Sequence, residues 1–396
     1  MKNIAFLPFL LCITLLAACV ETDISVPGFP DMVRYFSTTE GHIQLTMSIN
    51  FLGFCLAGLF LGPLSDAYGR RPVMLWGNVI FLIGAIGTAT APTLASLIAW
   101  RFFQGIGASA AFTLFIAMIA DAYQGERASH LASRLNAMLT AAMAGAPMLG
   151  GLLVETWGWR STYSSVAVLC LVATILLFLF LPETNQNRKP LDLKEILRNY
   201  KSLITSRDFI ALALVPTVLC AGYMAFVSCA VFFYTEQLKV PLGLFTLHQG
   251  CVIACFSVVS FFGGKIYAIV GARQAVVAGA VLNMVGACGL VLLSWLDSSS
   301  AMLFTLSMSM FSTGVALSYG PTFTASMEVM PEVKGTASSL NSSIRLVVMA
   351  FLIGLAGYTY DGTFLPVAAI QLACASSAAL LTAFIVARPH LRALLA

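Results

Sequence analysis

Twelve apolar runs, each long enough for a helix that crosses a lipid bilayer, constrain this chain more than any other feature of its sequence. Such a helix needs about 20 mostly apolar residues, and in lipid only helices or closed barrels satisfy every backbone polar group. The runs therefore predict an all-α membrane protein. The predicted spans are Ile4–Val26, His42–Leu61, Pro72–Ala91, Leu94–Ala120, Leu131–Val154, Ser161–Leu181, Phe209–Tyr234, Phe245–Val270, Arg273–Trp295, Ala301–Met327, Lys334–Tyr358 and Gly362–Ala387.

The composition agrees with this prediction. Hydrophobic residues make up 59% of the 396, and only 10% are charged. In a soluble protein about a quarter of the residues are charged. Too few polar residues remain to coat a soluble core, so apolar side chains must face lipid as well as each other. The net charge of +4 is too small and too scattered to indicate binding to nucleic acid.

The ten cysteines give no indication of a metal site. All lie within apolar runs, with no Cys-x-x-Cys pair and no cluster of Cys and His at metal-ligand spacing. We expect them to be ordinary small buried side chains. No metal and no cofactor is predicted.

The basic residues are distributed unevenly between the two sides of the predicted membrane domain. Of the 21 Lys and Arg residues, only Arg34, Arg160 and Lys239 fall on one side. Arg101 and Arg345 lie within spans, and all the others fall on the opposite side. Because loops rich in Lys and Arg stay in the cytoplasm, both termini are predicted to be cytoplasmic. We expect a multi-pass protein of a bacterial inner (cytoplasmic) membrane.

The N-terminus permits a rival interpretation. Lys2, an apolar run and the segment Leu16–Cys19 together look like a secretory signal that ends in a lipoprotein cleavage box. Cleavage there would leave eleven spans, whereas the distribution of basic residues fits an even number with both ends on one side. We therefore favour an intact first span.

A ten-residue pattern occurs twice. Gly62–Arg71 joins the second and third predicted spans, and Gly264–Arg273 joins the eighth and ninth. Both segments read Gly-x-(Leu/Ile)-x4-Gly-x-Arg. Because this pattern recurs at the corresponding loop of each half, the two halves of the chain are predicted to have arisen by duplication. Duplicated halves are typical of secondary transporters, which bind substrate where the repeats meet.

Six segments resemble motifs of the major facilitator superfamily. Those in the fourth and fifth spans narrow the resemblance to its twelve-span drug:proton antiporters, in the bicyclomycin/chloramphenicol-resistance branch. The resemblance implies the major facilitator fold, with two pseudo-symmetric six-helix bundles, 1–181 and 209–396, joined by a cytoplasmic link, 182–208. The segments are Asp23–Pro30, Gly62–Arg71, Leu97–Ser109, Ala146–Gly151, Leu181–Thr184 and Gly335–Leu340.

Four positions depart from that branch. Ala146 replaces a glycine of the fifth-span motif, Ser25 and Val26 replace Tyr-Leu, and Arg345 stands where an uncharged polar residue is more usual. These departures bear on the range of substrates more than on the fold.

Ionisable residues within spans are costly and are therefore candidate functional residues. Glu21 and Asp23 are predicted to lie in the outward part of the first span, and Asp23 matches the family position. A carboxylate in a partly dry cavity can exchange a proton as its access to water alternates, and it can attract a cationic substrate. The alternative is that both residues simply mark a helix end in water.

Arg101 and Gln104 lie one turn apart on the same face of the fourth span. A guanidinium does not release its proton in practice, so Arg101 is expected to influence a neighbouring carboxylate or to hold a gating hydrogen bond. The alternative is that its side chain extends to the membrane interface.

Arg345 is the most unusual charged residue of the second half. It either binds an anionic group of the substrate or pairs with an acid such as Glu21, Asp23 or Glu328, and the sequence leaves both possibilities open. Asn50 is a further candidate for the proton and substrate cavity.

The loop between the second and third spans contains Gly62, Asp66, Gly69, Arg70 and Arg71. The resemblance implies an ion-paired latch that stabilises one access state. Considered without the resemblance, the two glycines supply tight turns, Asp66 caps the third span, and the arginines follow the general excess of basic residues on that side.

Pro147, Gly150 and Gly151 are expected to bend or thin the fifth span. In the family this motif accompanies antiport rather than uptake. The alternative is a packing kink of a kind that any membrane helix tolerates.

These features predict a proton-coupled secondary transporter that exports drugs or small amphipathic metabolites, siderophores among them, by antiport. The alternatives are a proton symporter for a nutrient and a non-transporting membrane sensor. The sequence contains no phosphate-binding Gly-Lys-Ser/Thr loop and no catalytic constellation, so neither a primary pump nor an enzyme is predicted. The expected partners are a small-molecule substrate, protons as the coupling ion and the lipid bilayer. The chain is expected to act as a monomer, without nucleic acid.

Overall fold

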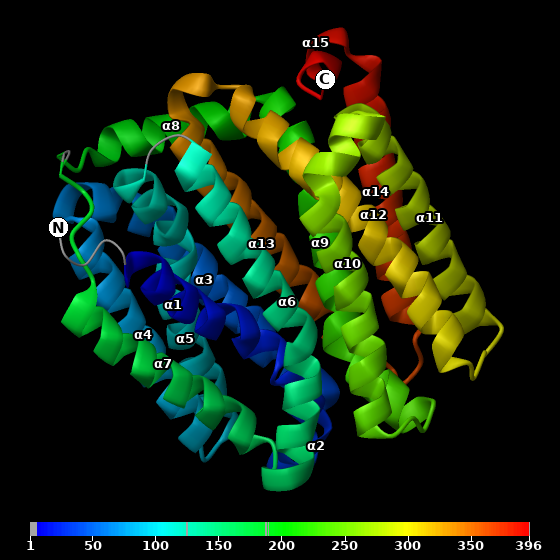
Figure 1. The fold of residues 1–396 in the computed structure, drawn as a ribbon. Helices are drawn as coiled ribbons and strands as arrows, with labels where there is room; N and C mark the ends of the chain where they lie inside the picture. The colour runs from blue at the N-terminus through cyan, green and yellow to red at the C-terminus, as the bar shows by residue number, and fades with distance from the viewer. Residues whose placement is uncertain (1–5, 124–125, 187, 189, 396) are drawn as a thin grey trace. The chain divides into compact units, whose positions relative to one another are not determined.

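The computed structural model consists of helices and the turns that join them (Figure 1). It describes all residues except 1–5, 124–125, 187, 189 and 396, and only the backbone of 126–130, 132–133, 136–137 and 193. Lys2 and Ile4 therefore lie outside the described residues. Within the described part of the chain no strand occurs, and 12 helices are long and apolar enough to cross a membrane. The predicted all-α class and the number of spans are confirmed.

The helices of the two halves follow one another in chain order. The first half comprises α1 (Leu7–Asp23), the 3₁₀ turn η2 (Val26–Gly28), α2 (Phe29–Phe36), α3 (Glu40–Tyr68), α4 (Arg70–Thr90), α5 (Leu94–Ala122), α6 (Glu126–Trp157) and α7 (Arg160–Phe180). The remainder comprises α8 (Leu193–Thr205), α9 (Arg207–Phe232), the π-helical turn η3 (Phe233–Gln237), α10 (Leu242–Val270), α11 (Ala272–Trp295), α12 (Ala301–Glu328), the 3₁₀ turn η4 (Pro331–Val333), α13 (Lys334–Thr359), α14 (Leu365–Ala387) and α15 (Pro389–Ala393).

The chain forms two compact units. One contains Met1–Thr39 and Leu45–Asp192, and the other contains Glu40–Gln44 and Leu193–Ala396. In the first unit α1 packs against α5, α6 and α7, and α4 packs against α5 and α7. In the second unit α9 packs against α12, α13 and α14, and α11 packs against α12 and α14. Within its own half, the first span therefore packs against the fourth, fifth and sixth spans, as the seventh packs against the tenth, eleventh and twelfth. The third and ninth spans correspond in the same way, as expected for duplicated halves.

The repeated loop has the same backbone in both copies. A single glycine separates α3 from α4 and α10 from α11, and both glycines have a positive φ, 105° at Gly69 and 88° at Gly271. Only glycine adopts such a φ without strain. The predicted turn at Gly62 is wrong: Gly62 lies within α3, which continues until the Gly69 N–H donates to the Ser65 carbonyl at 3.1 Å.

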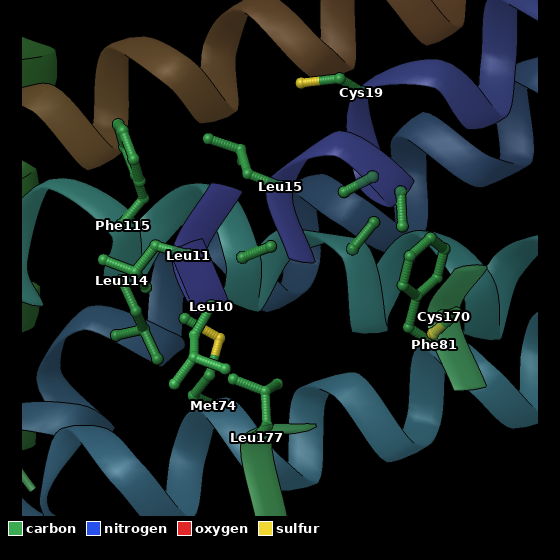
Figure 2. Close-up of a cluster of buried hydrophobic side chains, with 14 of the residues drawn as sticks. Leu10, Leu11, Leu15, Cys19, Met74, Phe81, Leu114, Phe115, Cys170 and Leu177 are labelled. Atoms are coloured by element: carbon green, nitrogen blue, oxygen red, sulfur yellow. The ribbon is translucent and has the colours of Figure 1, made fainter. Parts of the chain in front are cut away.

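The core of the first unit is assembled around α1. Figure 2 shows apolar side chains of α1 among side chains from α4, α5 and α7. Cys19, which the rival interpretation of the N-terminus treated as a lipoprotein cleavage residue, is 7% exposed and belongs to this core. The side chains labelled in Figure 2 are Leu10, Leu11, Leu15, Cys19, Met74, Phe81, Leu114, Phe115, Cys170 and Leu177.

The predicted polar link contains a helix that its composition did not reveal. Within 182–208, α8 buries Leu203 completely against a small cluster of the second unit that includes Phe209 and Leu340. One apolar face is enough to anchor a short helix whose other faces are polar. The link is therefore ordered against the second unit over this helix.

Candidate functional site

The first span is interrupted near its middle. α1 ends at Asp23, and the helical path continues through η2 and α2, which carry Pro27 and Pro30 in their first turns. Proline lacks an N–H, so regular hydrogen bonding breaks here while the chain keeps its direction. Because the span extends to Phe36 rather than to Val26, Glu21 and Asp23 lie nearer its middle than the predicted bounds indicated. Glu21 and Asp23 are buried, with 2% and 4% of their surfaces exposed, so the alternative that they mark a helix end in water is excluded.

Glu21 is held by side chains from two other spans. Its Oε2 lies 3.3 Å from Arg101 Nη1, and its Oε1 accepts a hydrogen bond from Asn50 Nδ2 at 3.1 Å. Asn50 Nδ2 also donates to the Arg101 carbonyl at 3.2 Å, which joins α3 to α5. The ion pair is almost fully buried, so each charge depends on the other.

Gln104 extends this arrangement by one helical turn. Its Oε1 accepts hydrogen bonds from Arg101 Nη1 at 2.9 Å and from Thr88 Oγ1 of α4 at 3.3 Å. The Arg101 guanidinium also lies 5.7 Å from the centre of the Tyr163 ring. We refer to Glu21, Asn50, Thr88, Arg101 and Gln104 as the buried polar cluster. The expected proximity of Arg101 to a carboxylate is observed, and its alternative place at the membrane interface is excluded.

Two donors of the buried polar cluster have no acceptor among the described residues. Arg101 Nε and Gln104 Nε2 are both buried and unpartnered. Buried polar atoms in folded proteins almost always have a partner, so such exceptions suggest a place for a ligand or a change of partner. The two free N–H groups can therefore donate hydrogen bonds to an oxygen atom of a ligand.

Asp23 differs from Glu21 although it follows only two residues later. Residues two apart face different sides of a helix, so the two carboxylates have different surroundings. Among the described residues of the first unit, none forms a hydrogen bond or an ion pair with the Asp23 carboxylate, although Asp23 is only 4% exposed. One acid of the first span is thus neutralised and the other is not.

Close backbone contacts position the buried polar cluster. A Cβ atom on Gly105 would lie 2.0 Å from the Asn50 carbonyl oxygen, and one on Gly84 would lie 2.6 Å from the Gln104 nitrogen. α5 therefore touches α3 and α4 at the level of its polar residues, which is possible only without side chains at these glycines. Gly105 of the fourth-span motif and Gly84 of the third span thus bring Asn50 and Thr88 within reach of Arg101 and Gln104.

The fifth-span motif lies against the interruption in the first span. Pro147 is inside α6, and Gly150 and Gly151 are buried one turn later. A Cβ on Gly150 would lie 2.2 Å from the Ile24 carbonyl oxygen, next to Asp23. The motif therefore brings the backbone of the fifth span into direct contact with the first.

The loop between α3 and α4 contains an ion-paired network. Arg70 Nη1 lies 2.6 Å from Asp66 Oδ1, and Arg70 Nε lies 3.0 Å from Asp121 Oδ2 at the end of α5. The same guanidinium donates to Ser65 Oγ at 2.5 Å. Its side chain is only 11% exposed, so these partners surround it. The pairing that the resemblance implied between Asp66 and Arg70 is present, and Asp121 is an additional partner.

Glu183, which follows α7, caps the start of α4. Its two carboxylate oxygens accept the backbone N–H groups of Arg70 at 2.9 Å and Arg71 at 3.3 Å. A carboxylate at a helix N-terminus satisfies unpaired donors and interacts favourably with the helix dipole. The alternative role of Asp66 as the cap is wrong, because Glu183 occupies that position. Arg71 donates to the Phe178 carbonyl at 3.3 Å.

Arg345 lies in α13 and has neutral partners. Its Nη1 donates to Tyr319 Oη at 2.6 Å, and its Nη2 makes a longer contact of 3.5 Å with Ser342 Oγ. The possible pairing with Glu328 is wrong, because Glu328, the last residue of α12, forms an ion pair with Lys334 at 2.5 Å. Glu21 is paired with Arg101 instead.

Sequence reasoning missed three of these residues. Glu183 belonged to a recognised motif, Leu181–Thr184, but nothing in its spacing indicated a contact with the start of α4. Asp121 was the first acid after the fourth apolar run, and Thr88 was one of many hydroxyl groups in the third. Their partners lie far away in the chain, so only the packing of the helices reveals their roles.

Comparison with known proteins gives one match to a protein family. The family model described as Major Facilitator Superfamily matches residues 11–354, which is most of the chain.

Relatives and solved structures match over nearly the whole length. A bicyclomycin resistance protein homolog of Haemophilus influenzae is 25% identical over 375 residues, which cover 92% of each chain. Multidrug resistance protein D of Escherichia coli is 26% identical over 369 residues, covering 91% of each. The structure of a xylose transporter from E. coli, in a partially occluded inward-open conformation, matches with a TM-score of 0.72 at 16% identity and 97% coverage of each chain. At that identity the structural likeness shows the fold alone.

Proposed function

This chain belongs to the Major Facilitator Superfamily, and we propose that it exports drugs or small amphipathic metabolites across a bacterial inner membrane in exchange for protons. Membership makes it a multi-pass membrane transporter. Export is supported by two relatives that are named for resistance to bicyclomycin and to multiple drugs. The fifth-span motif Ala146–Gly151, which resembles that of antiporters, supports the same direction.

The observation that carries the proposal is the contrast between two carboxylates of the first span. Glu21 is neutralised by Arg101 at 3.3 Å, whereas Asp23 is equally buried without a cation. An ionised carboxylate without a partner is costly inside a membrane domain. Asp23 is therefore the group with a physical reason to carry a proton, and Glu21 with Arg101 forms the fixed part of the site.

The remaining residues have supporting roles in this proposal. Arg101 Nε and Gln104 Nε2 supply unpartnered donors for a substrate oxygen. The contact between Gly150 and Ile24 places the fifth span beside Asp23. The network of Asp66, Arg70 and Asp121 stabilises one of the two access states. Protons are the only coupling ion that the proposal requires, and one chain carries all of these residues.

Inverted membrane vesicles test the proposal. After respiration has acidified the lumen, addition of chloramphenicol or bicyclomycin is expected to make the lumen more alkaline, as a pH-sensitive dye reports. Asp23→Asn should abolish this response, because an amide cannot exchange a proton. Asp297→Asn, which changes an exposed acid in the turn after α11, is the matched control and should respond as the unchanged protein does.

Two results would contradict the proposal. If Asp23→Asn keeps the full proton response, Asp23 is not the proton carrier. If an inward proton gradient drives accumulation of the same compounds in whole cells, the protein is a symporter rather than an exporter.

A further inference from the structure

Arg345 lies deep in the second unit, and no described residue of that unit provides it with a counter-charge. Arg345 is the twelfth residue of α13, about 17 Å along the helix from Lys334 at 1.5 Å per residue. Its side chain is only half-buried. A guanidinium at that depth is costly in contact with lipid, so charged groups there face the protein interior or a water-filled space. The accessible part of Arg345 is therefore expected to face the transport route.

The protein partners of Arg345 do not neutralise it. Tyr319 Oη, at 2.6 Å, and Ser342 Oγ, at 3.5 Å, are both uncharged hydroxyl groups. Among the described residues of the second unit, no carboxylate lies within 4.0 Å of the guanidinium. Arg101, by contrast, has Glu21 as its counter-charge. Arg101 is thus paired with a carboxylate of its own unit, whereas Arg345 has only neutral partners in its own unit.

An aromatic surface lies beside this charge. The Arg345 guanidinium carbon is 5.2 Å from the centre of the Tyr319 ring. The Tyr319 ring is stacked on that of Phe323, one turn further along α12, with 5.7 Å between centres and 6° between planes. Both rings are half-buried, so part of this flat surface is accessible. The cluster combines a planar cation with a planar apolar surface.

We propose that Arg345, Tyr319 and Phe323 bind an organic carboxylate whose flat aromatic body lies against the two rings. The guanidinium matches the geometry of a carboxylate, and the single charge of each balances the other. A phosphate monoester carries about −1.5 to −2 at neutral pH and would leave excess negative charge, so a carboxylate fits better. The inference rests on the proposed function and adds aromatic carboxylates to the compounds that the protein exports.

Three probes that share one ring system test the inference. They are 1-naphthoate, 1-naphthamide and 1-naphthylmethylammonium, which differ in charge but hardly in the aromatic body. Binding to the purified full chain in detergent, without a proton gradient, is measured by calorimetry. The affinity for naphthoate is expected to be at least about 10-fold higher than that for the amide, because one charge-assisted hydrogen bond contributes a difference of that size. The cation is expected to bind most weakly.

Arg345→Gln should lower the affinity for naphthoate to that for naphthamide and leave the affinity for naphthamide unchanged. Unchanged naphthamide binding also demonstrates that the variant is folded. Phe323→Leu should lower the affinity for all three probes to a similar extent, because the substitution removes aromatic surface but no charge. Arg388→Gln is the matched control, since it removes a half-exposed cation that binds Asp208 instead, and it should keep the preference for naphthoate.

Equal affinity of the unchanged protein for the three probes would overturn the inference, and this measurement does not depend on the folding of any variant. A preference for naphthoate that survives in Arg345→Gln would also overturn it. Because binding is measured at equilibrium, a failure of proton antiport in vesicles would contradict the proposed function and leave this result unaffected.

Discussion

The carboxylate of Glu183 accepts the backbone N–H of Arg70 at 2.9 Å, across 113 positions of the chain. One acid after the sixth span thereby fixes the first residue of the third. The same Arg70 binds Asp66 and Asp121 through its side chain. The end of the second span, the start of the third, the end of the fourth and the segment after the sixth are therefore joined at one residue.

Removal of the cap should destabilise the first unit. Glu183→Ala leaves the N–H groups of Arg70 and Arg71 without their acceptor, so the free energy of unfolding is expected to fall by about 1–2 kcal/mol. Denaturant titration of the purified protein measures the change. Glu155→Ala, which removes an exposed acid at the end of α6, should change the free energy by less than about 0.5 kcal/mol. Equal effects of the two changes would show that the cap does not contribute.

The pair of Arg70 and Asp121 should be energetically coupled. Arg70→Gln, Asp121→Asn and the double variant form a double-mutant cycle. Because the pair is mostly buried, 11% and 26% exposed, we expect a coupling free energy of about 1 kcal/mol in unfolding experiments. The transport rates of the same variants report whether the network biases an access state. If the two single effects on stability simply add, the two residues are not coupled.

A side chain at Gly105 should prevent the close approach of α3 and α5. In Gly105→Ala the new Cβ would lie 2.0 Å from the Asn50 carbonyl oxygen, so the helices must separate and the buried polar cluster must lose its geometry. We expect a loss of about 3 kcal/mol or failure to fold, measured by thermal unfolding and size-exclusion chromatography. Gly145→Ala is the control, because no atom lies within 4 Å of its new Cβ, and it should be neutral or slightly stabilising. Similar melting temperatures for both variants would contradict the packing argument.

The buried pair of Glu21 and Arg101 should respond to single and double changes in a non-additive way. Glu21→Gln or Arg101→Gln leaves one buried charge unpaired and is expected to cost about 3–5 kcal/mol, whereas the double change should recover much of that loss. Denaturant titration again provides the measurement. The exposed pair of Asp31 and Arg34, with side chains 34% and 76% exposed, is the matched control and should cost about 0–1 kcal/mol. A double variant as unstable as the sum of its single variants would exclude a coupled pair.

The fold was more predictable from the sequence than the site because lipid imposes one requirement on every span. Length and hydropathy are local properties, so the twelve spans were found to within a few residues in most cases. The first span is the instructive exception. Its predicted end is Val26, whereas the candidate span continues to Phe36, so Asp23 lies nearer the middle of the span than predicted.

The site depends on contacts between residues far apart in the chain, which composition and periodicity do not contain. Arg101 was recognised as a charge in a span, but its partner Glu21 is 80 positions away. Geometry was also needed to exclude Glu328 as the partner of Arg345, since Glu328 is paired with Lys334. Gly69 was correctly predicted as a turn because a positive φ is a local demand, whereas Gly62, with the same residue type, is helical.

The close contact between Gly150 and the Ile24 carbonyl oxygen couples the position of the fifth span directly to that of the first. No side chain lies between the two backbones at that point to absorb a displacement. Any tilt or slide of α6 is therefore transmitted directly to the peptide unit that follows Asp23. A displacement of the fifth span and the proposed protonation of Asp23 would thus affect the same few atoms.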